Sequence, residues 1–283
     1  MPKLQPRMGV QCRACRRIVD LMSAAIMATW AKLADTIARE SSIEVPLASL
    51  RRMIEAASRD ARAAAQHLYG LLVDTQALYP NVGDPLSTQL NLASHRWLAQ
   101  EHENSYSDWL AWILERQDDP SRVLPLFGLP SAQSVPGKWA IEREVPTAFG
   151  RLDLLISNPQ LGVLCVEAKT ESEPGPDQLE RYANWLAGKQ SLGLVLLAID
   201  QPEDDPPGQK YRFCSWKNVA LGLRIWSSIW LREPGRLYDA VMTLAFCGAI
   251  ERNLLSLHCS GLNALRTAEY LEEVLSHAKT TSQ

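Results

Sequence analysis

The sequence predicts an α/β fold in which a central mixed β-sheet is flanked by helices, with further helical regions before and after it. Residues 138–216 contain short alternating or apolar runs that are typical of strands. Residues 12–79 and 217–283 instead repeat apolar residues every three or four positions, as helices do. The 283 residues, 46% hydrophobic and 22% charged, have the composition of an ordinary globular protein.

The N-terminal part is predicted to be helical, with two or more long helices and a break near residues 41–46. The segment YPNVGDP at 79–85 has two prolines and a glycine, and it predicts a boundary between a helical region, 1–87, and a second domain, 88–283. The apolar faces of residues 1–87 must be buried on the rest of the chain, a second copy or a partner protein.

The second domain is expected to start with a helix from Ser105 to about Gln117, capped by Ser105 or Ser107. Asp177 is expected to cap a later helix that ends near Gly188, and helical periodicity returns from Lys217 with a break at REPGR. The expected strands cover residues 138–146, 149–157, 163–169, 192–200 and 211–216.

Charged residues interrupt two of these apolar strands in the stretch GRLDLLISNPQLGVLCVEAK, residues 150–169. Alternation places Glu167 and Lys169 on one face of their strand, and Arg151 and Asp153 on one face of the preceding strand. If the strands pair, these charges converge. Two buried carboxylates repel each other, so the arrangement needs a cation, either Lys169 with Arg151 or a metal ion.

A metal ion would give this cluster a chemical role. Carboxylate oxygens with an open site favour Mg²⁺ or a similar ion such as Mn²⁺, and Lys169 could orient or deprotonate a water or stabilise developing negative charge. These groups suit a phosphodiester hydrolase. Gln178 and Tyr182 lie four apart on the following helix, and Glu103 lies just before the Ser105 helix. A structural salt bridge explains the same charges without catalysis.

These residues resemble the PD-(D/E)XK nuclease superfamily. GRLD at 150–153 is similar to its G-x-x-D strand, VEAK at 166–169 to its (D/E)-x-K strand, and QLERY at 178–182 to the Q-x-x-x-Y helix of its exonuclease-like branch. ENSYSDWLAWIL at 103–114 resembles the Glu-bearing first helix of a bacterial subgroup. The resemblance covers residues 100–220, and Leu152 stands where the first motif has proline.

The resemblance implies a restriction-endonuclease-like core and a nuclease that uses Mg²⁺ or Mn²⁺, with DNA as the expected substrate and RNA not excluded. It also suggests a role in defence against foreign DNA. The implied metal ligands are Asp153, Glu167, the Ala168 carbonyl and Glu103. Lys169 would be the catalytic lysine, and Gln178 and Tyr182 would support the site or contact the substrate.

Nucleic acid would have to meet a local basic surface, because the net charge is −3. The basic residues expected to contact phosphates are Arg143, Arg151, Arg181 and Lys189. Six scattered cysteines and no secretory leader indicate a cytoplasmic protein. The apolar run 18–37 is interrupted by charges, so no membrane span or membrane partner is expected.

Two other functions fit the sequence. One is a catalytically silent nucleic-acid-binding protein on the same fold, against which the intact Asp153, Glu167 and Lys169 argue. The other is a helical interaction protein whose central charges are structural. The chain has no GxxxxGK[ST] or GxSxG motif, and CRAC at 12–15 has no second pair of ligands that would complete a zinc site.

Overall fold

The computed structural model describes residues 47–79, 98, 101, 103–131, 137–171, 177–202, 210–257 and 263–281. The chain divides into two compact units, one with the residues up to Ala77 and Leu257–Leu275, the other with Leu78–Ser256 and Ser276–Gln283. The boundary predicted near residue 88 lies outside the described residues. Each unit is described by itself below.

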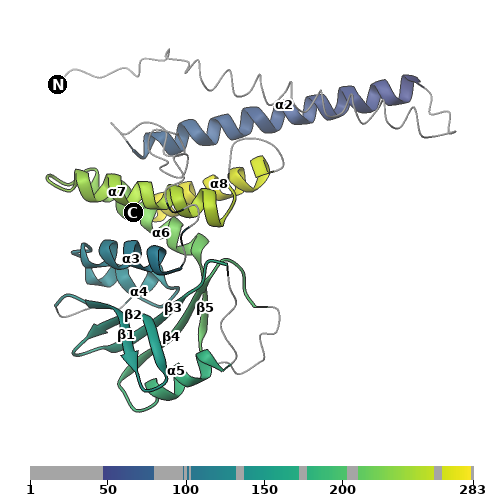
Figure 1. Cartoon of the computed structure of the whole chain (residues 1–283). Helices are drawn as coiled ribbons and strands as arrows, with labels where there is room; N and C mark the ends of the chain where they lie inside the picture. The colour runs from purple at the N-terminus through teal and green to yellow at the C-terminus, as the bar shows by residue number, and fades with distance from the viewer. Residues whose placement is uncertain are drawn as a thin grey trace, which may run out of the picture. The chain divides into compact units, whose positions relative to one another are not determined.

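The second unit contains a five-stranded mixed sheet with the strand order β1-β2-β3-β4-β5 (Figure 1). The strands are β1 (Ala140–Thr147), β2 (Gly150–Asn158), β3 (Gly162–Ala168), β4 (Ser191–Ala198) and β5 (Arg212–Ser215). The first three are antiparallel, whereas β4 runs parallel to β3 and β5 parallel to β4. This confirms the predicted α/β class and the central mixed sheet, with each strand close to its expected place.

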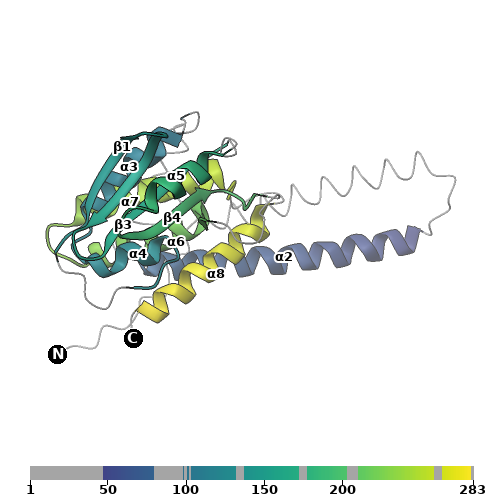
Figure 2. The same ribbon diagram turned by 90° about the horizontal axis from the view of Figure 1, so that it is seen from below.

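Helices cover both faces of the sheet. Helix α3 (Glu103–Glu115) packs on β1, β2 and β3, while α5 (Gln178–Leu186) packs on β4 from the opposite side (Figure 1). Figure 2 looks at the α5 side of the sheet. Both helices have their first residues near one end of β2 and β3. Residues at the start of α3 and of α5 can therefore contact the same end of the sheet from opposite faces.

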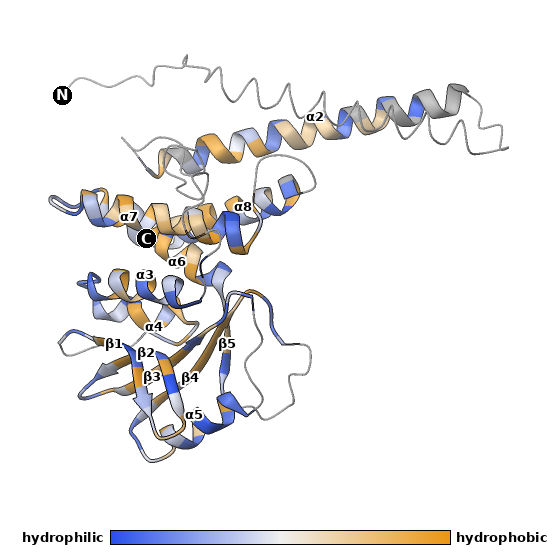
Figure 3. Cartoon of the chain, in the orientation of Figure 1, coloured by the Kyte–Doolittle hydropathy of each residue, from blue (hydrophilic) through white to orange (hydrophobic). Residues whose placement is uncertain are grey.

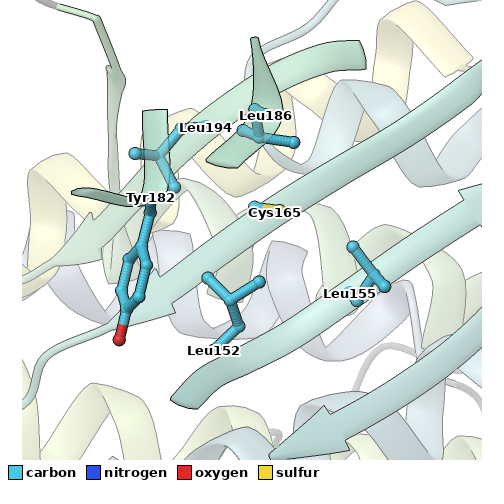
Figure 4. Packing of buried hydrophobic residues seen from close by; sticks show 6 residues of the cluster. All are labelled: Leu152, Leu155, Cys165, Tyr182, Leu186 and Leu194. Carbon is cyan, nitrogen blue, oxygen red and sulfur yellow. The ribbon is translucent and has the colours of Figure 1, made fainter. Parts of the chain in front are cut away.

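Apolar side chains fix α5 against the sheet. Strands β3 and β4 are apolar over most of their length (Figure 3). Figure 4 shows the cluster of buried residues between α5 and the sheet, which consists of Leu152, Leu155, Cys165, Tyr182, Leu186 and Leu194. Burying a large apolar side chain contributes about 1.5–3 kcal/mol, so Tyr182 and Leu186 hold α5 in a defined position. That position sets where Gln178, at the start of the helix, can reach.

Further helices complete the second unit. A short 3₁₀ turn (Pro120–Arg122) and α4 (Val123–Leu126) follow α3. Helix α6 (Trp216–Trp230) begins directly after β5, where the Ser215 side chain accepts a hydrogen bond from the Asn218 N–H. Helix α7 (Leu237–Ala249) continues into a π-helix (Ile250–Leu254). The predicted break at REPGR separates α6 from α7.

Two predicted helix caps are wrong. Helix α3 begins at Glu103, two residues earlier than predicted, and the Ser107 hydroxyl donates to the Glu103 carbonyl within the helix at 2.9 Å. Ser105 donates to the Glu101 carboxylate. Asp177 precedes α5 but makes no side-chain capping bond, because its backbone is left-handed (φ 62) and N-cap residues are usually extended. Glu103 therefore lies in the first turn of its helix.

The first unit contains α2 (Leu47–Ala77) and the first part of α8 (Ala264–Thr281). The His67 Nε2 lies 2.9 Å from Oε1 of Glu272. Predicted helical residues before 47, and the apolar run 18–37, lie outside the described residues. Across the residues that the structure describes, no helix has both the length and the apolar character needed to cross a membrane.

Candidate active site

Asp153 and Glu167 lie at one end of the β2–β3 ladder. The last registered pair toward this end is Leu154 with Val166, so the two acids occupy the next position on each strand. Only 7% of Asp153 and 1% of Glu167 is exposed. The Asp153 Oδ2 accepts a hydrogen bond from the Ala168 N–H at 2.8 Å. The structure thus brings the two carboxylates together in a buried position.

The Lys169 ammonium group lies between acids from two elements. Its Nζ is 2.9 Å from Oε1 of Glu167 and 3.0 Å from Oε1 of Glu103 on α3. Glu103 therefore joins the site through Lys169. Within the described ranges, no three His, Cys, Asp or Glu side chains form a group that could hold a metal ion.

Gln178 and Tyr182 reach the cluster from α5. The Gln178 Nε2 donates to Glu167 Oε1 at 2.6 Å and to Tyr182 Oη at 3.3 Å. The Tyr182 hydroxyl donates in turn to the Arg151 carbonyl at 2.7 Å. Because the two residues are four apart, they share one face of the helix. Helix α5 is thereby connected to both acid-bearing strands.

Burial raises the pKa of both carboxyl groups. The pKa of Glu167 rises to about 7 through burial and the neighbouring Asp153 charge, with Lys169 opposing the shift. Burial also raises the pKa of Asp153, although the Ala168 N–H opposes this. For Lys169, burial lowers the pKa, but the hydrogen bonds and charges of Glu167 and Glu103 outweigh it and raise the pKa above its ordinary value. Lys169 is therefore a cationic donor at neutral pH.

One atom of the cluster shows what kind of group would complete it. The Glu167 Oε2 is buried and has no hydrogen-bond partner. A buried acceptor without a partner costs free energy, and a cation next to two close carboxylates would offset that cost. Asp153 and Glu167 therefore fit a divalent cation bound by hard oxygen ligands.

Arg151 does not supply the second cation that the sequence offered as an alternative. Its side chain pairs with Glu144 on β1 and is 61% exposed. Glu144 has a left-handed backbone (φ 52), and neither Glu144 nor Asp153 is among the paired residues of β1 and β2. Strict alternation along the strands is lost at this point, which explains why Arg151 turns away from the buried acids. Arg143 likewise pairs with Asp108 on α3.

Arg181 and Lys189 lie on the exposed surface of the α5 segment. The Lys189 Nζ is 4.3 Å from the centre of the Trp185 ring. Of the four basic residues expected to contact phosphates, these two are solvent-exposed without a carboxylate partner among the described residues, whereas Arg143 and Arg151 are ion-paired. Arg181 and Lys189 are thus better placed than Arg143 and Arg151 to bind an anionic ligand.

Two residues near the site were missed from the sequence. The Trp216 Nε1 donates to the Lys169 carbonyl at 2.9 Å, and Glu144 lies beside Asp153 and holds Arg151. Trp216 ends a strand-like run, YRFCSW, and nothing in that run indicates a contact 47 residues upstream. Glu144 lies in an alternating strand, where a glutamate is ordinary. Both contacts depend on the tertiary arrangement of the sheet.

No protein-family model, no curated protein and no solved structure matches this chain. The structure itself shows an α/β fold with an open five-stranded mixed sheet flanked by helices.

Proposed function

We propose that this protein is a metal-dependent nuclease that hydrolyses phosphodiester bonds, with DNA as the substrate. The observation that carries the proposal is the buried pair Asp153 and Glu167, with an unpartnered Glu167 oxygen and the Lys169 ammonium group beside it. Buried carboxylates with raised pKa values and a specific cationic partner are typical of functional sites. A salt bridge that served only stability would not need a second buried acid.

Asp153, Glu167 and the Ala168 carbonyl would hold Mg²⁺ or Mn²⁺, because hard oxygen donors suit these ions. The ion would supply Lewis-acid chemistry, activating water and polarising the phosphate. Asp153 is oriented for this role by the Ala168 N–H, and Glu167 by the Gln178 side chain. Each acid thus has a neighbour that fixes its position, as metal ligands usually have.

Lys169 would act as a donor to the phosphate. It is cationic at neutral pH, and its Nζ already lies beside Glu167. A hydrogen bond from a fixed ammonium group to the developing negative charge stabilises the transition state. Glu103 would hold the Lys169 side chain from α3. Its proposed role is therefore to orient the lysine, and to reach a metal only through water.

The restriction-endonuclease-like fold is part of the same proposal. Strands β2 and β3 are neighbours and bring GRLD and VEAK together, and α5 brings the Gln178 and Tyr182 pair to the same end of the sheet. The exposed Arg181 on α5 and Lys189, three residues after its end, would contact phosphates. Defence against foreign DNA would be the biological role that the resemblance suggests.

The proposal is tested by titrating the protein with Mg²⁺ and Mn²⁺ in a calorimeter and by incubating it with linear, circular and single-stranded DNA and with RNA, each with and without metal. We expect binding of a divalent ion and metal-dependent cleavage of DNA. Asp153→Ala should lose both, whereas Glu115→Gln, on the exposed end of α3, should lose neither. Metal binding that is unchanged in Asp153→Ala would contradict the proposed ligands.

A catalytically silent nucleic-acid-binding protein is the second candidate. It is favoured by one observation, which is that the Lys169 ammonium group already has two carboxylate partners. That candidate predicts DNA binding without cleavage under every metal condition. A helical interaction protein with structural charges predicts neither DNA binding nor a metal site that depends on Asp153. Metal titration, the cleavage assay and a calorimetric titration with DNA together separate all three functions.

A further inference from the structure

Lys169 is held by its backbone as well as by its ammonium group. It lies one residue beyond the last registered β3–β4 pair, which joins Ala168 and Leu197. Its N–H donates to the Leu197 carbonyl at 2.7 Å, which continues the parallel ladder by one bond. Its carbonyl instead accepts a hydrogen bond from the indole Nε1 of Trp216, at 2.9 Å. A side chain therefore secures the end of β3.

The donor of this bond is rigidly placed. Trp216 is the first residue of α6, directly after β5, and its exposed fraction is 0%. Its ring makes edge contacts with Tyr106 on α3 and Phe246 on α7, with ring centres 5.8 Å and 6.5 Å apart. Close packing on two sides leaves the indole little freedom to move. The N–H therefore points at the Lys169 carbonyl from a fixed position.

The packing around Trp216 is itself supported by hydrogen bonds. The Tyr106 hydroxyl donates to the Leu98 carbonyl at 3.1 Å and accepts from Asn253 Nδ2 at 3.2 Å. Asn253 belongs to the π-helix that follows α7, a kind of helix that is frequent at functional sites. Buried Tyr106 and Trp216 thus link the half-buried Asn253 of the π-helix to Lys169.

We propose that Trp216 is a positioning residue, which fixes the Lys169 backbone so that the ammonium group lies between Glu167 and Glu103. A lysine side chain has many rotamers, and a shift of its backbone changes which of them reach both acids. The hydrogen bond from Trp216 acts at the base of that side chain. The placement of Lys169 is a property of the folded protein, whereas its effect on cleavage rests on the proposed nuclease function.

Trp216→Phe tests the proposal because it removes the N–H and keeps an aromatic ring. Trp230→Phe is the matched control, since Trp230 is also buried and lies at the other end of the same helix. The first readout is the rate at which an amine-acylating reagent modifies Lys169 in the metal-free protein, measured by mass spectrometry relative to Lys189. Loss of one hydrogen bond predicts a rise of about five-fold in Trp216→Phe. Trp230→Phe should stay near the wild-type ratio.

A second replacement covers the case in which Trp216→Phe does not fold. In 3-benzothienylalanine, sulfur replaces the indole N–H in a ring of nearly the same shape, so the packing is retained and the donor is lost. The same rise in Lys169 acylation is expected. If neither change at position 216 raises the acylation of Lys169 above that of Trp230→Phe, the inference is wrong.

Cleavage gives the second readout. Trp216→Phe should lower kcat about five-fold with little change in KM, because the lysine acts on the reacting phosphate and not on substrate binding. Equal kcat values for Trp216→Phe and Trp230→Phe would contradict the inference. If the wild-type protein cleaves no substrate, the nuclease function fails, and Lys169 acylation still decides the role of Trp216.

Discussion

Replacing Glu167 by glutamine should stabilise the metal-free protein at alkaline pH. Glu167 is 1% exposed and its pKa rises from 4.5 to about 7, mainly because of burial. A raised carboxyl pKa means that the folded protein binds the proton more tightly than the unfolded chain does. The stabilisation that the folded protein gains from this tighter proton binding is thus fully present below about pH 4.5, and it is lost as the pH rises through about 7. Above that range the charged carboxylate costs about 3 kcal/mol.

Glutamine removes this charge but has a cost of its own. Its oxygen can take the place of Oε1, which accepts from Lys169 and Gln178. Its NH₂ group then lies at the position of Oε2, where no partner is present, at a cost of about 1–3 kcal/mol. The net gain at about pH 8 should be about 1 kcal/mol, which corresponds to a rise in Tm of about 2–4 °C. At about pH 4 the variant should instead be less stable than the wild-type protein by about 1–3 kcal/mol, because Glu167 is then protonated in both states and only the cost of the unpartnered NH₂ group remains.

Thermal melts of Glu167→Gln and the wild-type protein in EDTA, across this pH range, measure the difference. Adding Mg²⁺ should reverse the order, because only the wild-type protein gains stability from the bound ion. Asp153→Asn is expected to behave in the same direction, since burial also raises the pKa of Asp153. A lower Tm for Glu167→Gln at about pH 8 in EDTA would refute the reasoning and favour a structural salt bridge with Lys169.

Three further predictions concern other parts of the chain. Glu103→Gln should slow cleavage by about ten-fold or more, which is equivalent to about 1.4 kcal/mol, because Glu103 pairs with Lys169. Glu101→Gln is the control and should change the rate little, since the Glu101 side chain contacts Ser105. Equally small effects of both changes in cleavage assays would mean that Glu103 has no part in the reaction. Tyr182→Phe should lower the free energy of unfolding in urea by about 1 kcal/mol, because it removes the bond to the Arg151 carbonyl, and an unchanged value would mean that this bond adds no net stability. A chain that begins at Leu86 should aggregate or change its oligomeric state in light scattering, and a soluble, monomeric and fully active product would identify the preceding residues as an independent module.

The α/β class and the sheet could be predicted from local sequence patterns. The five strands were expected because alternation, apolar runs and turn residues mark them locally, as the SNPQLG turn does between β2 and β3. The meeting of Asp153 and Glu167 followed from strand pairing alone. Gln178 and Tyr182 were expected to reach the acids because their spacing places them on one helical face. Gln178 does bond to Glu167, whereas the Tyr182 hydroxyl bonds to the Arg151 carbonyl on β2.

Other features depend on tertiary contacts that local patterns do not encode. The bridge from Lys169 to Glu103 joins residues 66 apart and requires the docking of α3 on the sheet. The turn of Arg151 toward Glu144 follows from a left-handed residue inside a strand, which no glycine announces. Asp177 has a suitable side chain for a cap, but its backbone conformation prevents the bond. In each case the side chain was a plausible partner and the backbone decided the contact.

The most direct test of the nuclease proposal is the rate at which Lys169→Ala cleaves DNA at a Mg²⁺ concentration that saturates it in the calorimeter. Lys169 is proposed to act on the reacting phosphate and not to bind the metal, so Asp153 and Glu167 should still hold the ion. A positioned acid, base or charge contributes about 10²–10⁴-fold to the rate. The account predicts retained metal binding with a loss of cleavage of at least about 100-fold. Cleavage by Lys169→Ala at close to the wild-type rate would contradict it.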